Sequence, residues 1–168
     1  MVVSGINAGA NTGRVVLHSG TVGAALTAAN FGCSGLAVSL GAGRSSRWST
    51  AAELAVAGLA WLADEPAGSV LNLNVPNCEP SELLGVRNAR LASFGTVRAS
   101  VVEAPGGLQV VLGGGDDEVG TRDGEADDTD TALLLAGYAT LTSLSGIRGL
   151  ERPGAATAVE QCLPVRTG

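Results

Sequence analysis

The sequence has few of the residues that proteins use to bind nucleic acid. It contains no lysine, so all ten basic residues are arginine, and aromatic residues make up only 3% of the chain. The formal net charge is −6, and no run of basic residues occurs. Nucleic-acid binding relies on basic side chains at the phosphates and on aromatic stacking, so we expect no nucleic-acid partner. A nucleotide substrate remains compatible, because a metal ion can supply positive charge locally.

Cysteine and histidine are also scarce. The chain has one histidine and three widely spaced cysteines, Cys33, Cys78 and Cys162, which match neither a zinc pattern nor a disulfide framework. No signal peptide is recognisable, and the apolar run at 54–63 is too short to span a bilayer. We therefore expect a cytoplasmic protein with no membrane partner.

What the sequence does contain is an alternation of strand and helix patterns. With 168 residues and 45% hydrophobic residues, it suits one domain whose core is built from Ala, Val and Leu. The predicted elements, in order, are a short strand at Val2 and Val3, a helix at 20–31, a strand at 35–40, a helix at 50–62 and a strand at 70–75. This order predicts an α/β fold with a mostly parallel, layered sheet.

The second predicted helix has a candidate cap and a candidate apolar face. Ser49 or Thr50 is suited to the N-cap, and the sequence Asp-Glu-Pro at 64–66 ends the helix. The residues expected to share one packed face are Leu54, Ala57, Gly58, Trp61 and Leu62.

The pattern changes after Pro80. Strand-like runs at 86–91, 96–103 and 108–112 predict a β-hairpin excursion, either an arm or a hairpin that covers the domain's own sheet. Half of the 16 acidic residues lie at 113–130, without calcium-loop spacing, and we interpret that stretch as a solvated linker rather than a metal site. Three further elements are expected: a helix at 132–138 capped by Asp130, a strand at 139–144 and a short helix at 155–162.

The loop that follows the first strand is rich in glycine and asparagine. Gly5, Gly9 and Gly13 allow positive φ or a close approach to a ligand. Asn7 and Asn11 offer neutral oxygens and amide donors, which suit a hard cation or a phosphate oxygen. The alternative is that Asn7 is only a turn residue.

The sequence Ser19-Gly20-Thr21 stands where the first helix begins. Free N–H groups and the helix dipole make such a position an anion site, and Ser19 is a good N-cap. Two hydroxyl groups beside several N–H groups suit a phosphate. The alternative is that Ser19 serves only as a cap.

Three further residues near these elements have two interpretations each. His18, next to Ser19, could act as a base, but no carboxylate is identifiable to orient it, and we favour a packing or supporting role. Arg44 and Arg47 could contact a phosphate or a base, although surface arginines are the more common outcome.

Six stretches together resemble the SurE family of metal-dependent 5'-nucleotidases. They are SGINAGANTG (4–13), HSGTVGAAL (18–26), GLAVSL (35–40), LNLNVPN (71–77), LGVRNARL (84–91) and TDTALLLAGYATLTSL (129–144). The resemblance covers essentially the whole chain. One departure is His18, which stands where the family usually has tyrosine. The other is that the family's opening segment, which carries paired aspartates and a serine of the metal site, has no counterpart.

The resemblance implies a three-layer, Rossmann-like fold and hydrolysis of nucleoside 5'-monophosphates by a water activated by a divalent cation, Mg²⁺ or Mn²⁺. Asn7 matches the family's metal ligand, and Asn11 lies nearby as an orienting residue. Ser19, Gly20 and Thr21 match the turn that contacts the phosphate. The hairpin region corresponds to an arm used for subunit contacts, which implies a homodimer or homotetramer.

Because the family's opening segment has no counterpart here, the activity of this chain has more than one interpretation. One neutral asparagine cannot hold a divalent cation, because carboxylates must compensate its dehydration. The chain could be a catalytically impaired remnant that binds phosphate or acts in oligomer assembly, or it could be a fragment of a complete enzyme. We expect one SurE-like domain over 1–168 that lacks the family's N-terminal strands, with the hairpin arm and acidic loop at 79–128 and a tail at 145–168.

Overall fold

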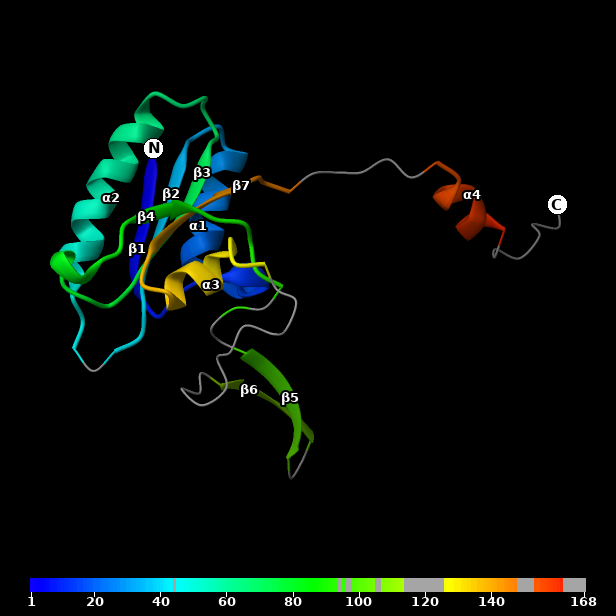
Figure 1. Ribbon diagram of the computed structural model, residues 1–168. Coiled ribbons are helices and arrows are strands. Elements are labelled where there is room, and N and C mark those ends of the chain that lie inside the picture. Colours follow the sequence, from blue (N-terminus) through cyan, green and yellow to red (C-terminus); the bar gives the residue numbers. More distant parts are fainter. Residues whose placement is uncertain are drawn as a thin grey trace, which may run out of the picture.

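The computed structural model describes residues 1–43, 45–93, 95, 98–104, 107–113, 126–147 and 153–161. Its centre is a five-stranded sheet in the order β1-β2-β3-β7-β4 (Figure 1). The strands are β1 (Val2–Ala8), β2 (Gly35–Leu40), β3 (Val70–Val75), β4 (Val86–Asn88) and β7 (Ala139–Leu144). Strands β1, β2 and β3 are parallel, β7 is antiparallel to β3, and β4 is parallel to β7. The expected α/β fold with a mostly parallel sheet is confirmed.

Helices lie on both faces of this sheet, which gives the expected three layers. Figure 1 shows α2 (Trp48–Ala63) on one side and α1 (Gly20–Asn30) on the other. The remaining helical elements are the 3₁₀ helices η1 (Gly13–His18) and η2 (Pro80–Glu82) and the short helices α3 (Asp130–Leu135) and α4 (Ala155–Glu160).

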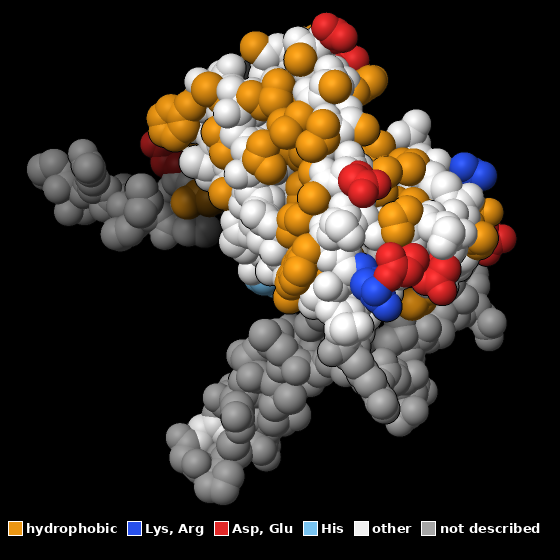
Figure 2. Space-filling view, turned by 90° about the vertical axis from the view of Figure 1, so that its left-hand side faces the viewer, with side chains coloured by type: hydrophobic (Ala, Val, Ile, Leu, Met, Phe, Trp, Pro, Cys, Tyr) orange, Lys and Arg blue, Asp and Glu red, His pale blue; other side chains and the backbone are white. Residues whose placement is uncertain are grey.

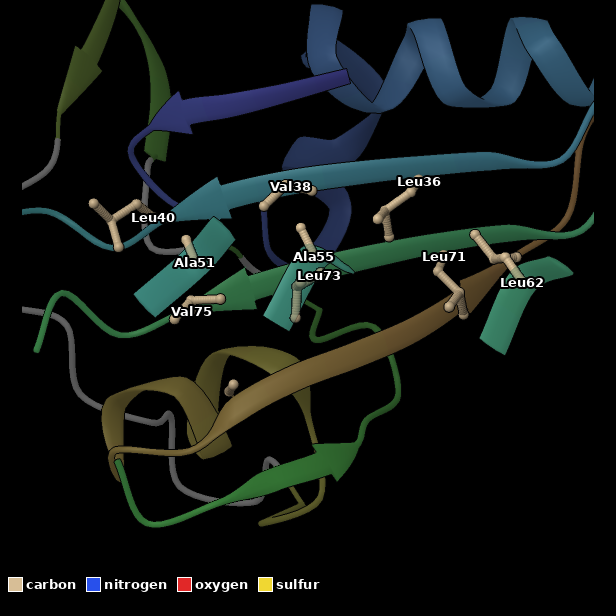
Figure 3. Close-up of a cluster of buried hydrophobic side chains, with 10 residues drawn as sticks. Leu36, Val38, Leu40, Ala51, Ala55, Leu62, Leu71, Leu73 and Val75 are labelled. Atoms are coloured by element: carbon tan, nitrogen blue, oxygen red, sulfur yellow. The ribbon is translucent and has the colours of Figure 1, made fainter. Parts of the chain in front are cut away.

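The larger part of the core lies between the sheet and α2. Alternate residues of a strand point to opposite faces, so the apolar residues at even positions of β2 and odd positions of β3 face α2. Figure 3 shows this cluster; its labelled residues are Leu36, Val38 and Leu40 of β2, Leu71, Leu73 and Val75 of β3, and Ala51, Ala55 and Leu62 of α2. On the opposite face, Ala37 and Val70 pack against Val22 and Ala25 of α1.

A glycine at the start of β2 allows α1 to approach the sheet closely. A Cβ atom at Gly35 would lie 2.5 Å from the carbonyl oxygen of Ala25. The approach therefore requires a residue without a side chain, and it fixes the height of α1 above the sheet.

The structure corrects the expected cap and the expected face of α2. The helix begins at Trp48, so neither Ser49 nor Thr50 is its N-cap. Thr50 instead donates a hydrogen bond from Oγ1 to the carbonyl oxygen of Cys78 at 2.9 Å. The buried stripe is rotated from the expected one but includes the expected Gly58 and Leu62. Its other apolar members are Ala51 and Ala55, and the expected Leu54, Ala57 and Trp61 line an apolar groove of about 400 Å³ beside β7 and β4.

Figure 2, which faces the α2 side, shows apolar side chains gathered over this part of the surface. On α2, Val56 and Trp61 are exposed. Glu53 is the only charged residue of this 16-residue helix, so α2 is apolar on nearly every side. Its apolar pattern alone could not show which stripe faces the sheet.

Strand β1 is longer than the two valines predicted. It extends to Ala8 and includes Asn7, although its pairing with β2 is irregular between Ser4 and Asn7. Gly5 lies in this irregular part with φ of 129°, and a Cβ atom there would be 2.3 Å from the carbonyl oxygen of Val38. Glycine here lets the strand continue past a close contact, so the interpretation of this stretch as loop was wrong.

The region after Pro80 contributes to two sheets. The first strand-like run supplies β4, which joins the main sheet beside β7 and is not part of the excursion. The other two form the antiparallel hairpin of β5 (Arg98–Ala104) and β6 (Gly107–Gly113). The predicted hairpin is therefore confirmed. Most of the acidic stretch, 114–125, lies outside the described residues.

Two predictions near the end of the chain need correction. Thr129, not Asp130, is the N-cap of α3, because its Oγ1 accepts a hydrogen bond from the N–H of Ala132 at 3.4 Å. This helix ends at Leu135, three residues before the predicted end. Helix α4 falls within the predicted range.

Within the described residues, no helix combines the length and apolar character that a membrane span requires.

Candidate functional site

The glycine- and asparagine-rich loop lies at the carboxyl edge of the parallel strands. After Asn7, the N–H of Gly9 donates to the carbonyl oxygen of Leu40, the last residue of β2, at 2.8 Å. The chain then passes through η1 into α1. Figure 1 shows η1 and the amino end of α1 at this same edge, where β1 and β2 end. Ligands of α/β sheets bind at this edge, so the position matches the predicted site.

Asn7 is half-buried and locally fixed. Its Nδ2 donates to the carbonyl oxygen of Gly9 at 2.7 Å, which leaves the side-chain oxygen outside this hydrogen bond. That oxygen is a suitable ligand atom for Mg²⁺ or Mn²⁺. Among the described residues, however, no group of three or more His, Cys, Asp or Glu is arranged to hold a metal ion. Asn7 alone does not make a divalent-cation site.

Ser19 caps α1, as predicted. Its Oγ accepts a hydrogen bond from the N–H of Val22 at 3.1 Å. Gly20 is exposed, and Ser19 and Thr21 are half-buried, so the first turn of this 11-residue helix is open to solvent. Its N–H groups and dipole favour an anion at this point.

Two of the three residues with open interpretations are described. His18 is exposed and ends η1. Arg47 is paired with the Glu79 carboxylate, and its backbone N–H donates to Asn77 Oδ1 at 2.9 Å. This pairing agrees with a surface role for Arg47. Arg44 lies outside the described residues.

Asn11 is only 7% exposed and lies over the sheet. Its backbone N–H donates to Asn74 Oδ1 at 2.7 Å, and its Nδ2 donates to Ser39 Oγ at 2.7 Å. Its carbonyl oxygen accepts hydrogen bonds from Asn72 Nδ2 at 2.8 Å and from Asn74 Nδ2 at 3.1 Å. Asn11 is therefore held on its N–H, its carbonyl and its side chain by two neighbouring strands.

A buried carboxylate holds the next part of the loop. Asp130, which is 0% exposed, accepts hydrogen bonds from the backbone N–H groups of Gly13, Ala92 and Thr131, each at 2.9 Å. Three donors to one carboxylate satisfy most of its acceptor capacity, which makes its burial tolerable. Asp130 thus links the loop to α3 and to the segment that follows β4.

The polar support of the loop consists of Ser39, Asn72, Asn74 and Asp130, and none of these supporting roles was predicted from the sequence. A signal was present in β3, because Asn72 and Asn74 occupy alternate positions of an otherwise apolar strand, and asparagine is depleted from strands. Nothing in the local pattern indicated that Asp130 contacts Gly13, since 117 positions separate them.

Comparison with known proteins places these observations in one family. The family model described as survival protein SurE matches residues 1–97. The 5'/3'-nucleotidase SurE of Yersinia enterocolitica is 36% identical over 147 residues, which cover 86% of this chain and 57% of that protein. The 5'-nucleotidase SurE of Chloroflexus aggregans is 38% identical over 148 residues, covering 84% and 57%. The chain thus spans little more than half the length of these relatives.

The fold agrees with this match. The crystal structure of the SurE protein from Aquifex aeolicus superposes with a TM-score of 0.66 and 22% sequence identity, over 95% of this chain and 64% of that one. Together, the matched family model, the curated relatives and the order of the sequence motifs show that this chain belongs to the SurE family.

Proposed function

We propose that the chain acts as a phosphomonoesterase on nucleoside 5'-monophosphates and binds their phosphate at the amino end of α1. The observation that carries this proposal is the open, Ser19-capped amino end of α1 at the edge of the sheet where β1 ends beside Asn7. Nucleotidase activity is named for relatives whose alignments cover more than 80% of this chain. The dianionic phosphate of the substrate suits a helix amino end.

In this proposal, three residues bind the phosphate. The Ser19 oxygen already accepts the N–H of Val22, so its own O–H remains a donor for a phosphate oxygen. The N–H groups of Gly20 and Thr21 belong to the first turn and have no intrahelical acceptor. Asn11 acts as an orienting residue, through its hold on the loop between Asn7 and this turn.

The proposal includes a divalent cation, Mg²⁺ or Mn²⁺, and Asn7 is the one ligand of this cation that we assign. When bound, such a cation polarises the phosphate and lowers the pKa of a bound water. The Asn7 side-chain oxygen fits as one ligand. The site requires carboxylate ligands in addition, beyond the described neighbours of Asn7.

Phosphate release from a nucleoside 5'-monophosphate by the purified chain, with Mn²⁺ and then with chelator, tests this function. We expect chelator-sensitive turnover that is lost in Asn7→Ala and strongly reduced in Ser19→Asp. Asn30→Ala, at the exposed far end of α1, is the matched control and should keep full activity. Absence of turnover from a folded chain would contradict the proposal. Binding of inorganic phosphate without turnover would instead favour an impaired, phosphate-binding chain.

We also propose that the β5–β6 hairpin makes subunit contacts in a homodimer or homotetramer. The hairpin forms its own two-stranded sheet, separate from the main sheet, and Figure 1 shows it projecting from the body of the domain. An isolated two-stranded hairpin is only marginally stable in water, which favours a partner surface. Light scattering coupled to size exclusion should give a dimer or tetramer mass, and deletion of 98–113 should reduce it.

A further inference from the structure

We propose that Asn74 is a positioning residue for the phosphomonoesterase site, because its carboxamide fixes the loop that joins Asn7 to Ser19. This inference rests on the proposed function. Asn74 lies on β3 and is 0% exposed, so it has no route to a substrate of its own. Its effect must pass through the residue that it holds, Asn11.

The contact is two-sided. Asn74 Oδ1 accepts the backbone N–H of Asn11 at 2.7 Å, and Asn74 Nδ2 donates to the backbone carbonyl of the same residue at 3.1 Å. One side chain therefore forms hydrogen bonds with both the N–H and the carbonyl of Asn11, as the backbone of a neighbouring strand would. Asn72 Nδ2 adds a second donor to that carbonyl at 2.8 Å.

Asn11 lies between the two parts of the proposed site. The pairing of β1 with β2 is followed by one backbone hydrogen bond, from the Gly9 N–H to the carbonyl of Leu40. Beyond it, the contacts that hold the chain include the hydrogen bonds to Asn11 and the Asp130 carboxylate at Gly13, the first residue of η1. Release of Asn11 would free the turn that sets Asn7 relative to Ser19.

The core packing of β3 does not involve the Asn74 side chain. The opposite face of β3 supplies Leu71, Leu73 and Val75 to the core. A carboxamide at position 74 is costly to bury unless its hydrogen bonds are made, and the loop makes two of them. A small displacement of a positioned group can reduce turnover by about 100-fold, whereas binding of the substrate changes less.

The test compares Asn74→Ala and Asn74→Asp with Thr142→Val in the full chain. Aspartate keeps the acceptor for the Asn11 N–H but replaces the donor that faces the Asn11 carbonyl. Thr142 is the matched control, because it lies on the neighbouring strand β7, is 3% exposed and has an Oγ1 without a partner among the described residues. The measurements are amide hydrogen exchange at Asn11, Gly20 and Thr21, and kcat and KM for a nucleoside 5'-monophosphate.

In Asn74→Ala we expect exchange at Asn11 to rise at least about tenfold and kcat to fall about 100-fold, with KM changed less than about threefold. The exchange rate at Asn11 and the kcat of Asn74→Asp should lie between those of this variant and the wild type. Both quantities in Thr142→Val should match the wild type. Faster exchange at Asn11 with unchanged kcat would overturn the inference. An equal loss of kcat in Thr142→Val would also overturn it. If Asn74→Ala does not fold, Asn74→Asp decides by the same comparison.

The two proposals fail in different ways. A wild-type chain without turnover contradicts the proposed function, and amide hydrogen exchange then decides the inference. Faster exchange at Asn11 that extends to Gly20 and Thr21 in the Asn74 variants, but not in Thr142→Val, would support a positioning role. Exchange at Gly20 and Thr21 that is equal in all variants would overturn it.

Discussion

The carboxylate of Asp130 accepts the backbone N–H of Gly13 at 2.9 Å, although 117 positions separate the two residues. The same carboxylate holds the N–H groups of Ala92 and Thr131. A residue of the late helix α3 thus supports the loop that begins the candidate site.

Asp130→Asn should destabilise the fold. One carboxylate oxygen becomes an NH₂ group that faces a backbone donor, so at least one buried N–H loses its acceptor. We expect the free energy of unfolding to fall by about 3 kcal/mol, measured by urea denaturation. Asp127→Asn, at an exposed position of the same segment, is the control and should change stability by less than about 0.5 kcal/mol. Equal effects of the two variants would contradict the role given to Asp130.

Gly35→Ala and Gly23→Ala should have opposite effects. At Gly35 the added Cβ meets the Ala25 backbone at 2.5 Å, so α1 must move away from the sheet at a cost of about 1–3 kcal/mol or more. At Gly23 no heavy atom lies within 4 Å, and alanine should stabilise α1 by about 0.5–1 kcal/mol. Thermal unfolding of both variants checks this pair. A neutral Gly35→Ala would show that α1 is not seated as described.

Ser19→Ala and Ser19→Asp should separate the capping role of Ser19 from its proposed phosphate role. Alanine removes the acceptor for the Val22 N–H and should cost about 1 kcal/mol of stability. Aspartate remains a good N-cap, so stability is kept, but its charge repels a phosphate. We expect Ser19→Asp to bind inorganic phosphate at least about tenfold more weakly than the wild type. Wild-type phosphate binding in Ser19→Asp would place the anion elsewhere.

Cys78 should react slowly with alkylating reagents. Burial raises the pKa of its thiol, and the negative charges of Glu82 and Glu79 raise this pKa further. The thiolate is the reactive form, so its fraction at pH 8 is reduced below that of an ordinary thiol. Glu82→Gln should lower the pKa of Cys78 and speed its alkylation at that pH, because one negative charge is removed. Iodoacetamide rates against pH, read by peptide mass spectrometry, check the shift. Unchanged alkylation rates in Glu82→Gln would contradict the contribution of the Glu82 charge to the pKa of Cys78.

Sequence by itself determined most of the elements and the N-cap of α1. The apolar runs of β2 and β3 predicted those strands with their observed bounds, because a buried parallel strand is a short continuous apolar stretch. The capping of α1 by Ser19 followed from local chemistry, since an N-cap contact spans only three residues. The motifs carried by these elements were enough to identify the family.

Tertiary structure decided everything that depends on distant partners. Because α2 is apolar on nearly every side, only the sheet selected Ala51, Ala55, Gly58 and Leu62 as its buried stripe. β1 continues through a glycine-rich stretch because β2 offers it backbone partners up to Leu40. The support of the site loop, from Asn74 at position 11 and from Asp130 at position 13, joins residues 63 and 117 positions apart. Local patterns carry no information about such contacts, because they form only when the folded chain brings the donor and the acceptor together.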